Sequence, residues 1–214
     1  MEIGLIVAGA ATGLLVGLTG VGGGALMTPL LLLVFGVAAP VAVATDLWFA
    51  ALTKLAAITT YRRQTKVDWV VVRRLWLGSI PVALGVAWLA SAEMGLGKVA
   101  WLSQAVGGVV CLAALGLWFG PALMRRLASA PQRAAPSRWQ APLTIGAGAA
   151  VGLAVALTSV GAGTLGSVML LALYPKRLDM HRLVLADLVH ATGLAIVAGL
   201  AYAASNLVDW RMLG

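Results

Sequence analysis

The stretch that decides the fold is a glycine run inside a long apolar segment, Thr19-Gly20-Val21-Gly22-Gly23-Gly24. Apolar residues precede it over 3–18 and follow it over 25–35. Long apolar segments favour helices, and a run of glycines interrupts a helix because glycine is conformationally permissive. The sequence therefore predicts a hairpin over residues 3–35 that is made of two helical pieces with a break between them.

A second break of the same kind occurs later in the chain, at Thr158-Ser159-Val160-Gly161-Ala162-Gly163. Three further pairs match between the two regions at one common offset: Asp46-Leu47 with Asp187-Leu188, Tyr61 with Tyr202, and Val67-Asp68-Trp69 with Val208-Asp209-Trp210. The breaks match at nearly the same offset. Several matches in register predict an internal duplication, with a broken hairpin over 143–174 that is equivalent to the hairpin over 3–35.

The composition places most of the chain in lipid. Of its 214 residues, 61% are hydrophobic and 10% are charged, whereas a soluble domain has roughly 25% charged residues. A soluble protein of this length could not bury so much apolar surface. Several apolar runs approach the length of about 20 residues that crosses a bilayer. We therefore predict an all-α integral membrane protein, folded as an inverted-repeat helical bundle with two glycine-broken hairpins.

The duplication divides the chain into two repeats. The expected parts are a first repeat over 1–120 (hairpin 3–35, helices at about 41–61, 69–90 and 98–119), a basic Pro/Arg linker over 121–141, and a second repeat over 142–214 (hairpin 143–174, helix at about 183–204). Only four residues follow the second Val-Asp-Trp. The second repeat is therefore expected to lack its last two helices, through truncation or because the protein is naturally shorter.

The basic residues predict the topology. The net charge is +8, and the Lys and Arg residues concentrate at 62–74, 120–142 and 175–182. These segments fall on one face if each hairpin returns to its starting side, and an excess of Lys and Arg marks cytoplasmic loops. The equivalent Val-Asp-Trp segments then face opposite sides of the cytoplasmic membrane. The repeats are therefore predicted to be inverted, as in many secondary transporters.

The two breaks predict an anion site near the middle of the bilayer. Backbone groups freed at membrane depth must be buried in protein or line a wet cavity. Helix N-termini near Ala25 and Thr164 would present free N–H groups and partial positive charge to an anion. The alternative is a close helix crossing that merely requires glycine. The candidate substrate-binding residues are Thr19, Gly20, Gly22, Gly23, Gly24, Lys54, Thr158, Ser159, Gly161, Gly163 and Thr164.

Few ionisable residues fall inside the predicted helices, and each has both a structural and a functional interpretation. Asp46 and Asp187 either cap free N–H groups at a helix start or exchange protons. His190 follows Asp187 on the same helix face, where it either packs or relays protons. Lys54 either extends its ammonium to the cytoplasmic face or is the counter-charge of a bound anion.

The motifs resemble those of a known family. The first break with Pro29 downstream, the segment Ala44-Thr45-Asp46-Leu47, and the basic Tyr61-Arg62-Arg63 loop before Val-Asp-Trp are similar to the TauE/SafE-type sulfite exporter family. The resemblance covers most of the chain. It implies transport of small sulfur-containing or organic anions, such as sulfite or sulfoacetate, with proton coupling as an option.

The predicted function is secondary active transport of such an anion, in the export direction, by alternating access. A passive anion channel and a truncated or accessory membrane subunit are the alternatives. The sequence contains no nucleophile–base pair that would predict an enzyme. It also contains no Cys/His cluster that would predict a metal or other cofactor, because Cys111 is the single cysteine. No basic patch with interleaved aromatics points to nucleic acid. The expected partners are the small anion and the bilayer, with a homodimer left open.

Overall fold

The computed structural model describes residues 27–28, 30–31, 34–63, 65–96, 137–159, 163–175 and 177–208, together with Gly9. Within these residues the regular elements are α3 (Ala39–Tyr61), α4 (Trp69–Leu96), α6 (Ser137–Thr158), α7 (Thr164–Leu173) and α8 (Met180–Ala204), all helical. Four of them contain apolar stretches long enough to cross a membrane, at Pro40–Tyr61, Trp69–Ala90, Arg138–Thr158 and Met180–Ala204. The predicted all-α membrane bundle is confirmed.

Parts of the predicted organisation lie outside the described residues. These are the helix at about 98–119, the first break and most of the hairpin over 3–35. Where the structure can be compared, α3, α4 and α8 begin within three residues of their predicted starts. Helix α7, with 10 residues, is too short to cross a bilayer alone.

One predicted boundary is wrong. The linker was expected to run to residue 141, but α6 already begins at Ser137 and contains Pro142. A proline inside a helix removes one backbone hydrogen bond. For this reason Pro142 indicates a helix boundary in the sequence. Here it lies in the second turn, and close packing of α6 on α4 holds this part of the chain helical despite the missing bond.

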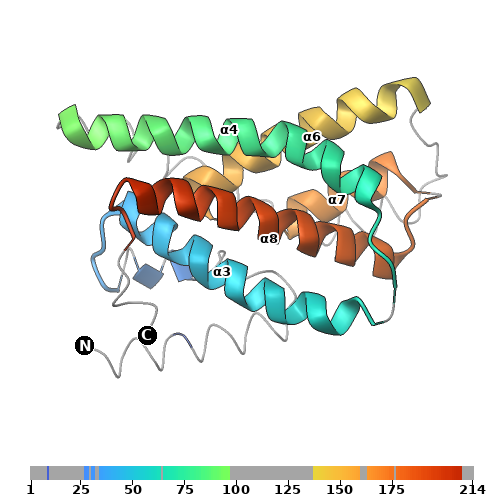
Figure 1. The fold of residues 1–214 in the computed structure, drawn as a ribbon, viewed down its shortest axis with the longest axis horizontal. Coiled ribbons are helices and arrows are strands. Elements are labelled where there is room, and N and C mark those ends of the chain that lie inside the picture. The colour runs from blue at the N-terminus through green and yellow to red at the C-terminus, as the bar shows by residue number, and fades with distance from the viewer. Residues whose placement is uncertain are drawn as a thin grey trace.

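The helices form a bundle in which α3 and α8 lie side by side, with α4 against α8 on the other side (Figure 1). Helices α6 and α7 lie behind, and α6 packs on α4. Helix α3 runs from left to right in Figure 1, whereas α8 runs from right to left. Since α3 and α8 carry the equivalent aspartates, their antiparallel arrangement is the one that an inverted repeat requires.

Glycines bring α4 and α6 into very close contact. A Cβ on Gly78 of α4 would overlap the carbonyl group of Ile145 in α6. On α6, a Cβ on Gly148 would overlap Leu75, and one on Gly152 would overlap the backbone of Ser79. Small residues allow this approach in lipid, where van der Waals packing replaces the hydrophobic effect as the force between helices. The close packing fixes the position of Ser79, which belongs to the site described below.

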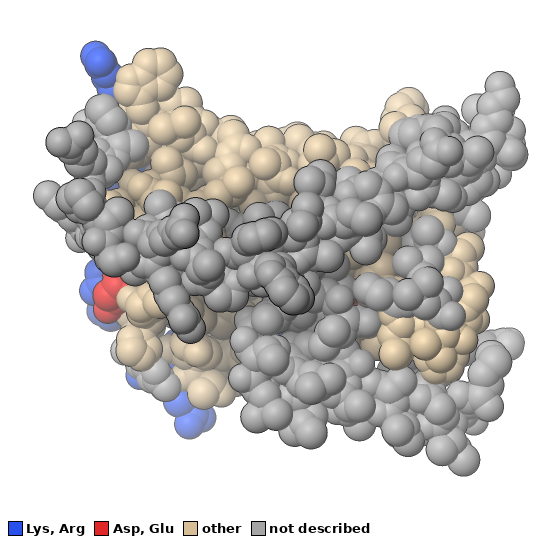
Figure 2. Space-filling model, turned by 180° about the vertical axis from the view of Figure 1, so that it is seen from behind, with Lys and Arg blue, Asp and Glu red and all other residues tan. Residues whose placement is uncertain are grey.

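Basic residues gather at one end of the bundle, which we call the basic end. Helix α3 ends there and helices α4, α6 and α8 begin there. Its cations include Arg62, Arg63, Lys66, Arg138, Arg177 and Arg182. Figure 2, which shows the opposite side of the molecule, has its blue side chains at the corresponding left end. Parts of all three predicted basic segments therefore lie at the same end, as the charge count predicted.

Two groups of hydrogen bonds, one around Asp68 and one around Tyr174, stabilise the basic end. Arg177, before α8, donates to Asp68 with Nε to Oδ2 at 2.7 Å and a terminal amino group to Oδ1 at 3.0 Å. Asp68 also caps α4 by accepting hydrogen bonds from the N–H groups of Val70 and Val71. Nearby, the Tyr174 hydroxyl accepts a hydrogen bond from Arg74 and shares another with Thr144. These contacts join segments of the first half to segments of the second.

Candidate functional site

Asp46 lies fully buried about two turns inside α3, where it contacts the segment after the first break and lies beside the second break. Its Oδ2 accepts a hydrogen bond of 2.5 Å from the hydroxyl of Thr28, a residue just beyond the first break. Its Oδ1 is buried and accepts no hydrogen bond from the residues that the structure describes. Ser159, in the second break, lies close enough to interact with the carboxylate, although no hydrogen bond of good geometry joins them. One carboxylate thus connects the two halves.

Ser159 has an unusual backbone conformation. It follows the end of α6 with φ of 57°, in the left-handed region that a non-glycine residue seldom adopts. Counted from the breaks, the equivalent residue of the first half is Gly20. The second break therefore adopts a glycine-like conformation at a serine, and this conformation places the Ser159 hydroxyl beside Asp46.

Asp187 occupies the equivalent position in α8, also about two turns inside the helix. Its Oδ1 is buried and accepts no hydrogen bond within the described part of the chain, and it rests against Gly166, where a Cβ would overlap it. Gly166 lies in the first turn of α7, directly after the second break. The carboxylate is therefore placed near a helix N-terminus, where the helix dipole favours negative charge.

The interpretation of these aspartates as caps of their own helices is wrong. The N-cap of α3 is Ala38, which makes no side-chain cap, and the N-cap of α8 is Asp179, which accepts a hydrogen bond from the N–H of Arg182. Two turns into a helix the backbone N–H groups are already bonded within the helix. Asp46 and Asp187 instead face other helices.

His190 lies one turn after Asp187 and is completely buried. Its Nε2 is 3.0 Å from the hydroxyl of Ser79 in α4, and its Nδ1 has no hydrogen-bond partner among the described residues. The indole N–H of Trp76, also in α4, donates to the carbonyl of His190 at 3.1 Å. Helix α4 therefore orients the imidazole, while its second nitrogen stays available.

Lys54 interacts electrostatically with both carboxylates. It lies eight residues after Asp46 on α3, which is about 12 Å along the helix, and it is only partly exposed. It interacts electrostatically with Asp187 and, less strongly, with Asp46 and His190. Within the described residues no carboxylate comes within ion-pair distance of its ammonium group. The ammonium group is therefore within electrostatic reach of both acids, and neither acid forms an ion pair with it among the described residues.

The other predicted site residues divide into three groups. Thr158 is buried and donates to the carbonyl of Ala154 in its own helix, and Gly163 is the N-cap of α7, which begins at Thr164. Others lie outside the described residues, namely Thr19, Gly20, Gly22, Gly23, Gly24 and Gly161. Within the part of the chain that the structure describes, no cluster of His, Cys, Asp or Glu has the composition of a metal site.

Sequence reasoning missed Thr28, Ser79 and Gly166. The repeat carried a signal for Thr28, because Ser167 holds the corresponding place after the second break. No comparable signal existed for Ser79, because a single serine in an apolar helix has no pattern that links it to a histidine in another helix. Gly166 is one of many glycines, and only the packed structure shows which one faces a carboxylate.

Comparisons with known proteins agree with this architecture. The family model described as "Sulfite exporter TauE/SafE" matches residues 5–214. The chain belongs to this family. It is also 34% identical, over 222 aligned positions, to the "Probable membrane transporter protein YjnA" of Bacillus subtilis (strain 168); the alignment covers 99% of this chain and 83% of that protein. No solved structure matches the chain. The resemblance found in the sequence is confirmed, and the chain is a multi-pass membrane transporter of the TauE/SafE type.

Proposed function

We propose that this protein is a proton-coupled secondary transporter that exports a small sulfur-containing or organic anion, such as sulfite or sulfoacetate, across the cytoplasmic membrane. One observation carries the proposal: two buried aspartates from opposite halves are within electrostatic reach of Lys54, and neither forms an ion pair with it among the described residues. Ionisable groups at membrane depth are costly and mark substrate or proton pathways. The name of the matching family and that of the similar protein support the same class of activity.

The geometry supports competition between a carboxylate and the substrate for the same positive field. Asp187 faces both Lys54 and the first turn of α7. Both features attract anions. When Asp187 is ionised, Lys54 and the N-terminus of α7 stabilise its own negative charge. When Asp187 is protonated, both can stabilise a substrate anion instead. Binding of the anion and protonation of Asp187 would then be linked, as coupling requires.

His190 supplies a route for the proton. One imidazole nitrogen is bound to Ser79, and the other is buried without a partner, one turn from Asp187. The two ring nitrogens of histidine allow it to accept a proton on one side and release it on the other. Phe49 holds the equivalent position in the first half. The proton route is therefore assigned to the second half alone.

Alternating access would come from movement of one half against the other. The Asp68–Arg177 ion pair and the Tyr174 contacts join the halves at the basic end. We take this end as cytoplasmic, because Lys and Arg concentrate there. Opening toward the cytoplasm would separate these contacts, whereas opening toward the other side would keep them.

The test is anion flux in proteoliposomes with an imposed pH gradient. The wild-type protein should move sulfite or sulfoacetate against its own gradient, which a passive channel cannot do. Lys54→Ala should lower the flux by about tenfold or more, the worth of one charge-assisted contact, and Lys54→Arg should restore part of it. Arg63→Ala, which removes an exposed cation from the basic end, is the matched control. Flux that depends only on the anion gradient, or equal flux in Lys54→Ala and Arg63→Ala, would contradict the proposal.

A further inference from the structure

An amphipathic groove opens at the basic end between α3, α4 and α8. It encloses about 700 Å³, and Arg62, Thr65 and Lys66 of the α3–α4 loop stand at its mouth. Both cations are exposed, and neither forms an ion pair within the described residues. The mouth of the groove therefore presents positive charge to whatever lies at the membrane surface.

The interior of the groove is mostly apolar. It follows α8 from Val189 to Ile196, eight residues that span about 10 Å, a large part of one leaflet of a hydrocarbon core about 30 Å thick. Opposite, α3 contributes Leu55 and Ile58. Trp69, half exposed, lies at the level of the cations, the depth at which tryptophan prefers to sit in a membrane.

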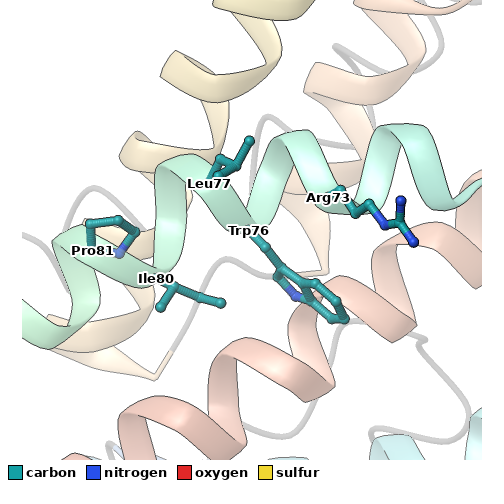
Figure 3. A pocket seen from close by; sticks show the side chains of 5 residues that line it. All are labelled: Arg73, Trp76, Leu77, Ile80 and Pro81. Carbon is teal, nitrogen blue, oxygen red and sulfur yellow. The ribbon is translucent and has the colours of Figure 1, made fainter.

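A second, shallower groove adjoins the first. It encloses about 420 Å³ and is lined by Arg73, Trp76, Leu77, Ile80 and Pro81 of α4 (Figure 3). Trp76 lines both grooves and so forms the wall between them. Its indole is held by the hydrogen bond to the His190 carbonyl and lies directly on Gly193, where a Cβ would overlap the ring. The wall is therefore rigid, and each groove has a cation at its basic end.

We propose that this pair of grooves binds one anionic phospholipid. Arg62 and Lys66 bind the phosphate, one acyl chain follows the groove between α3 and α8, and the second chain occupies the groove along α4 past Arg73. An apolar helix surface alone would contact any lipid. Charge complementarity at the mouth selects an anionic headgroup, since basic pockets between transmembrane helices recognise such lipids. The proposal is independent of the transported substrate and of the direction of transport.

The site also adjoins the transport machinery. Trp76 forms the wall between the two acyl-chain paths, and the same residue is bonded to His190. A lipid that holds Trp76 in place would hold the imidazole in its orientation toward Ser79. Lipid composition would then influence transport through this contact, without any lipid atom entering the site around Lys54.

The test measures lipid binding to the purified full-length protein in detergent by native mass spectrometry. Dioleoyl phosphatidylglycerol should bind more tightly than dioleoyl phosphatidylcholine. Arg62→Ala/Lys66→Ala should weaken phosphatidylglycerol binding by about 30-fold, about fivefold for each cation. The matched control, Arg63→Ala/Arg138→Ala, removes two exposed cations from the same end that line neither groove and should change binding by about twofold or less, because distant exposed charges are screened. Equal affinity for the two lipids, or equal losses in the two double variants, would overturn the proposal.

Two further arms separate other occupants. Dihexanoyl phosphatidylglycerol, which has the same headgroup on short chains, should bind more weakly than the dioleoyl lipid, and millimolar inorganic phosphate should not displace the latter. Equal binding of the short-chain lipid, or displacement by phosphate, would identify a site for phosphate alone and overturn the proposal. A change from dimer to monomer in Arg62→Ala/Lys66→Ala without loss of bound lipid would assign the grooves to a second copy of the chain.

Discussion

The surroundings of Asp46 and Asp187 differ although the two residues hold equivalent positions in inverted halves. Asp46 receives a hydroxyl hydrogen bond from Thr28 and faces Ser159 of the other half. Asp187 rests against Gly166, interacts electrostatically with Lys54, and is followed one turn later by His190 where the first half has Phe49. The repeat supplies two similar frames, and under the function proposed above the substitutions within them leave Asp46 a structural role and give Asp187 the exchange of protons.

The largest expected effect comes from neutralising each aspartate in turn. Asp187→Asn removes the proton-exchanging group at nearly constant size, so accumulation of the anion driven by a pH gradient should be abolished while exchange of anion for anion persists. Asp46→Asn should reduce both activities by about tenfold, because it weakens one charge-assisted hydrogen bond. Both are measured as flux in proteoliposomes. Identical behaviour of the two variants would remove the proposed difference between the halves.

A second prediction concerns the glycine beneath Asp187. Gly166→Ala places a methyl group where Oδ1 now lies, so Asp187 or α7 must shift. Overpacking of this kind costs about 1–3 kcal/mol, and pH-driven flux should fall by about tenfold. The control is Gly146→Ala in α6, where a Cβ meets nothing within 4 Å; this variant should be neutral or slightly stabilised, since alanine favours the helix by up to about 1 kcal/mol. Similar flux in both variants would show that contact between Asp187 and α7 is unimportant.

A third prediction concerns the partner of His190. Ser79→Ala leaves Nε2 buried without its hydrogen bond, at a cost of about 1–3 kcal/mol, and it frees the imidazole to reorient. The pH profile of the flux should therefore shift, while the affinity for the anion stays nearly unchanged. Ser205→Ala, which removes a hydroxyl bonded within its own helix, is the control and should leave the profile unchanged. An unshifted profile in Ser79→Ala would exclude His190 from the proton route.

The smallest effect is expected at the basic end. Partial burial alone would raise the pKa of Asp68, but the hydrogen bonds and charge of Arg177 outweigh it and lower the pKa below its ordinary value of 3.8. A lowered carboxylate pKa contributes stability above the unfolded value, and this contribution is lost as the pH falls through the folded value. Because Arg177 is about half exposed, with 47% of its side chain accessible, the ion pair is worth about 0.5–1 kcal/mol.

Asp68→Asn keeps the cap of α4, since asparagine caps helices as well as aspartate does, and removes the charge. Its thermal stability should therefore be lower than that of the wild type at neutral pH, and the difference should vanish in acid below the lowered pKa. Asp179→Asn, at the N-cap of α8, is the control for capping and should be nearly neutral. A stability difference that persists unchanged in acid would mean that the ion pair does not cause it.

Much of the fold was predictable because its signals are local. Apolar length placed α3, α4 and α8, and the second glycine break marked the interruption between α6 and α7. The distribution of Lys and Arg placed three basic segments at one end. The start of α6 was predicted poorly because Pro142 is a local signal that packing against α4 overrides. Local signals also mislead at Asp46 and Asp187, which resemble helix caps in the sequence. In the structure α3 and α8 each begin about two turns before them.

The sequence by itself determined that the chain is an all-α membrane bundle with matching segments in its two halves, and which few ionisable residues enter it, since hydrophobicity, segment matches and charge are properties of the chain in one dimension. Only the tertiary structure decided the partners of those residues. Lys54 interacts electrostatically with Asp187, Thr28 bonds Asp46, and Ser79 bonds His190. These contacts depend on helix rotation and crossing. The fit of Gly78, Gly148 and Gly152 between α4 and α6 positions Ser79 in this way, and no periodicity within one helix encodes its rotation relative to another.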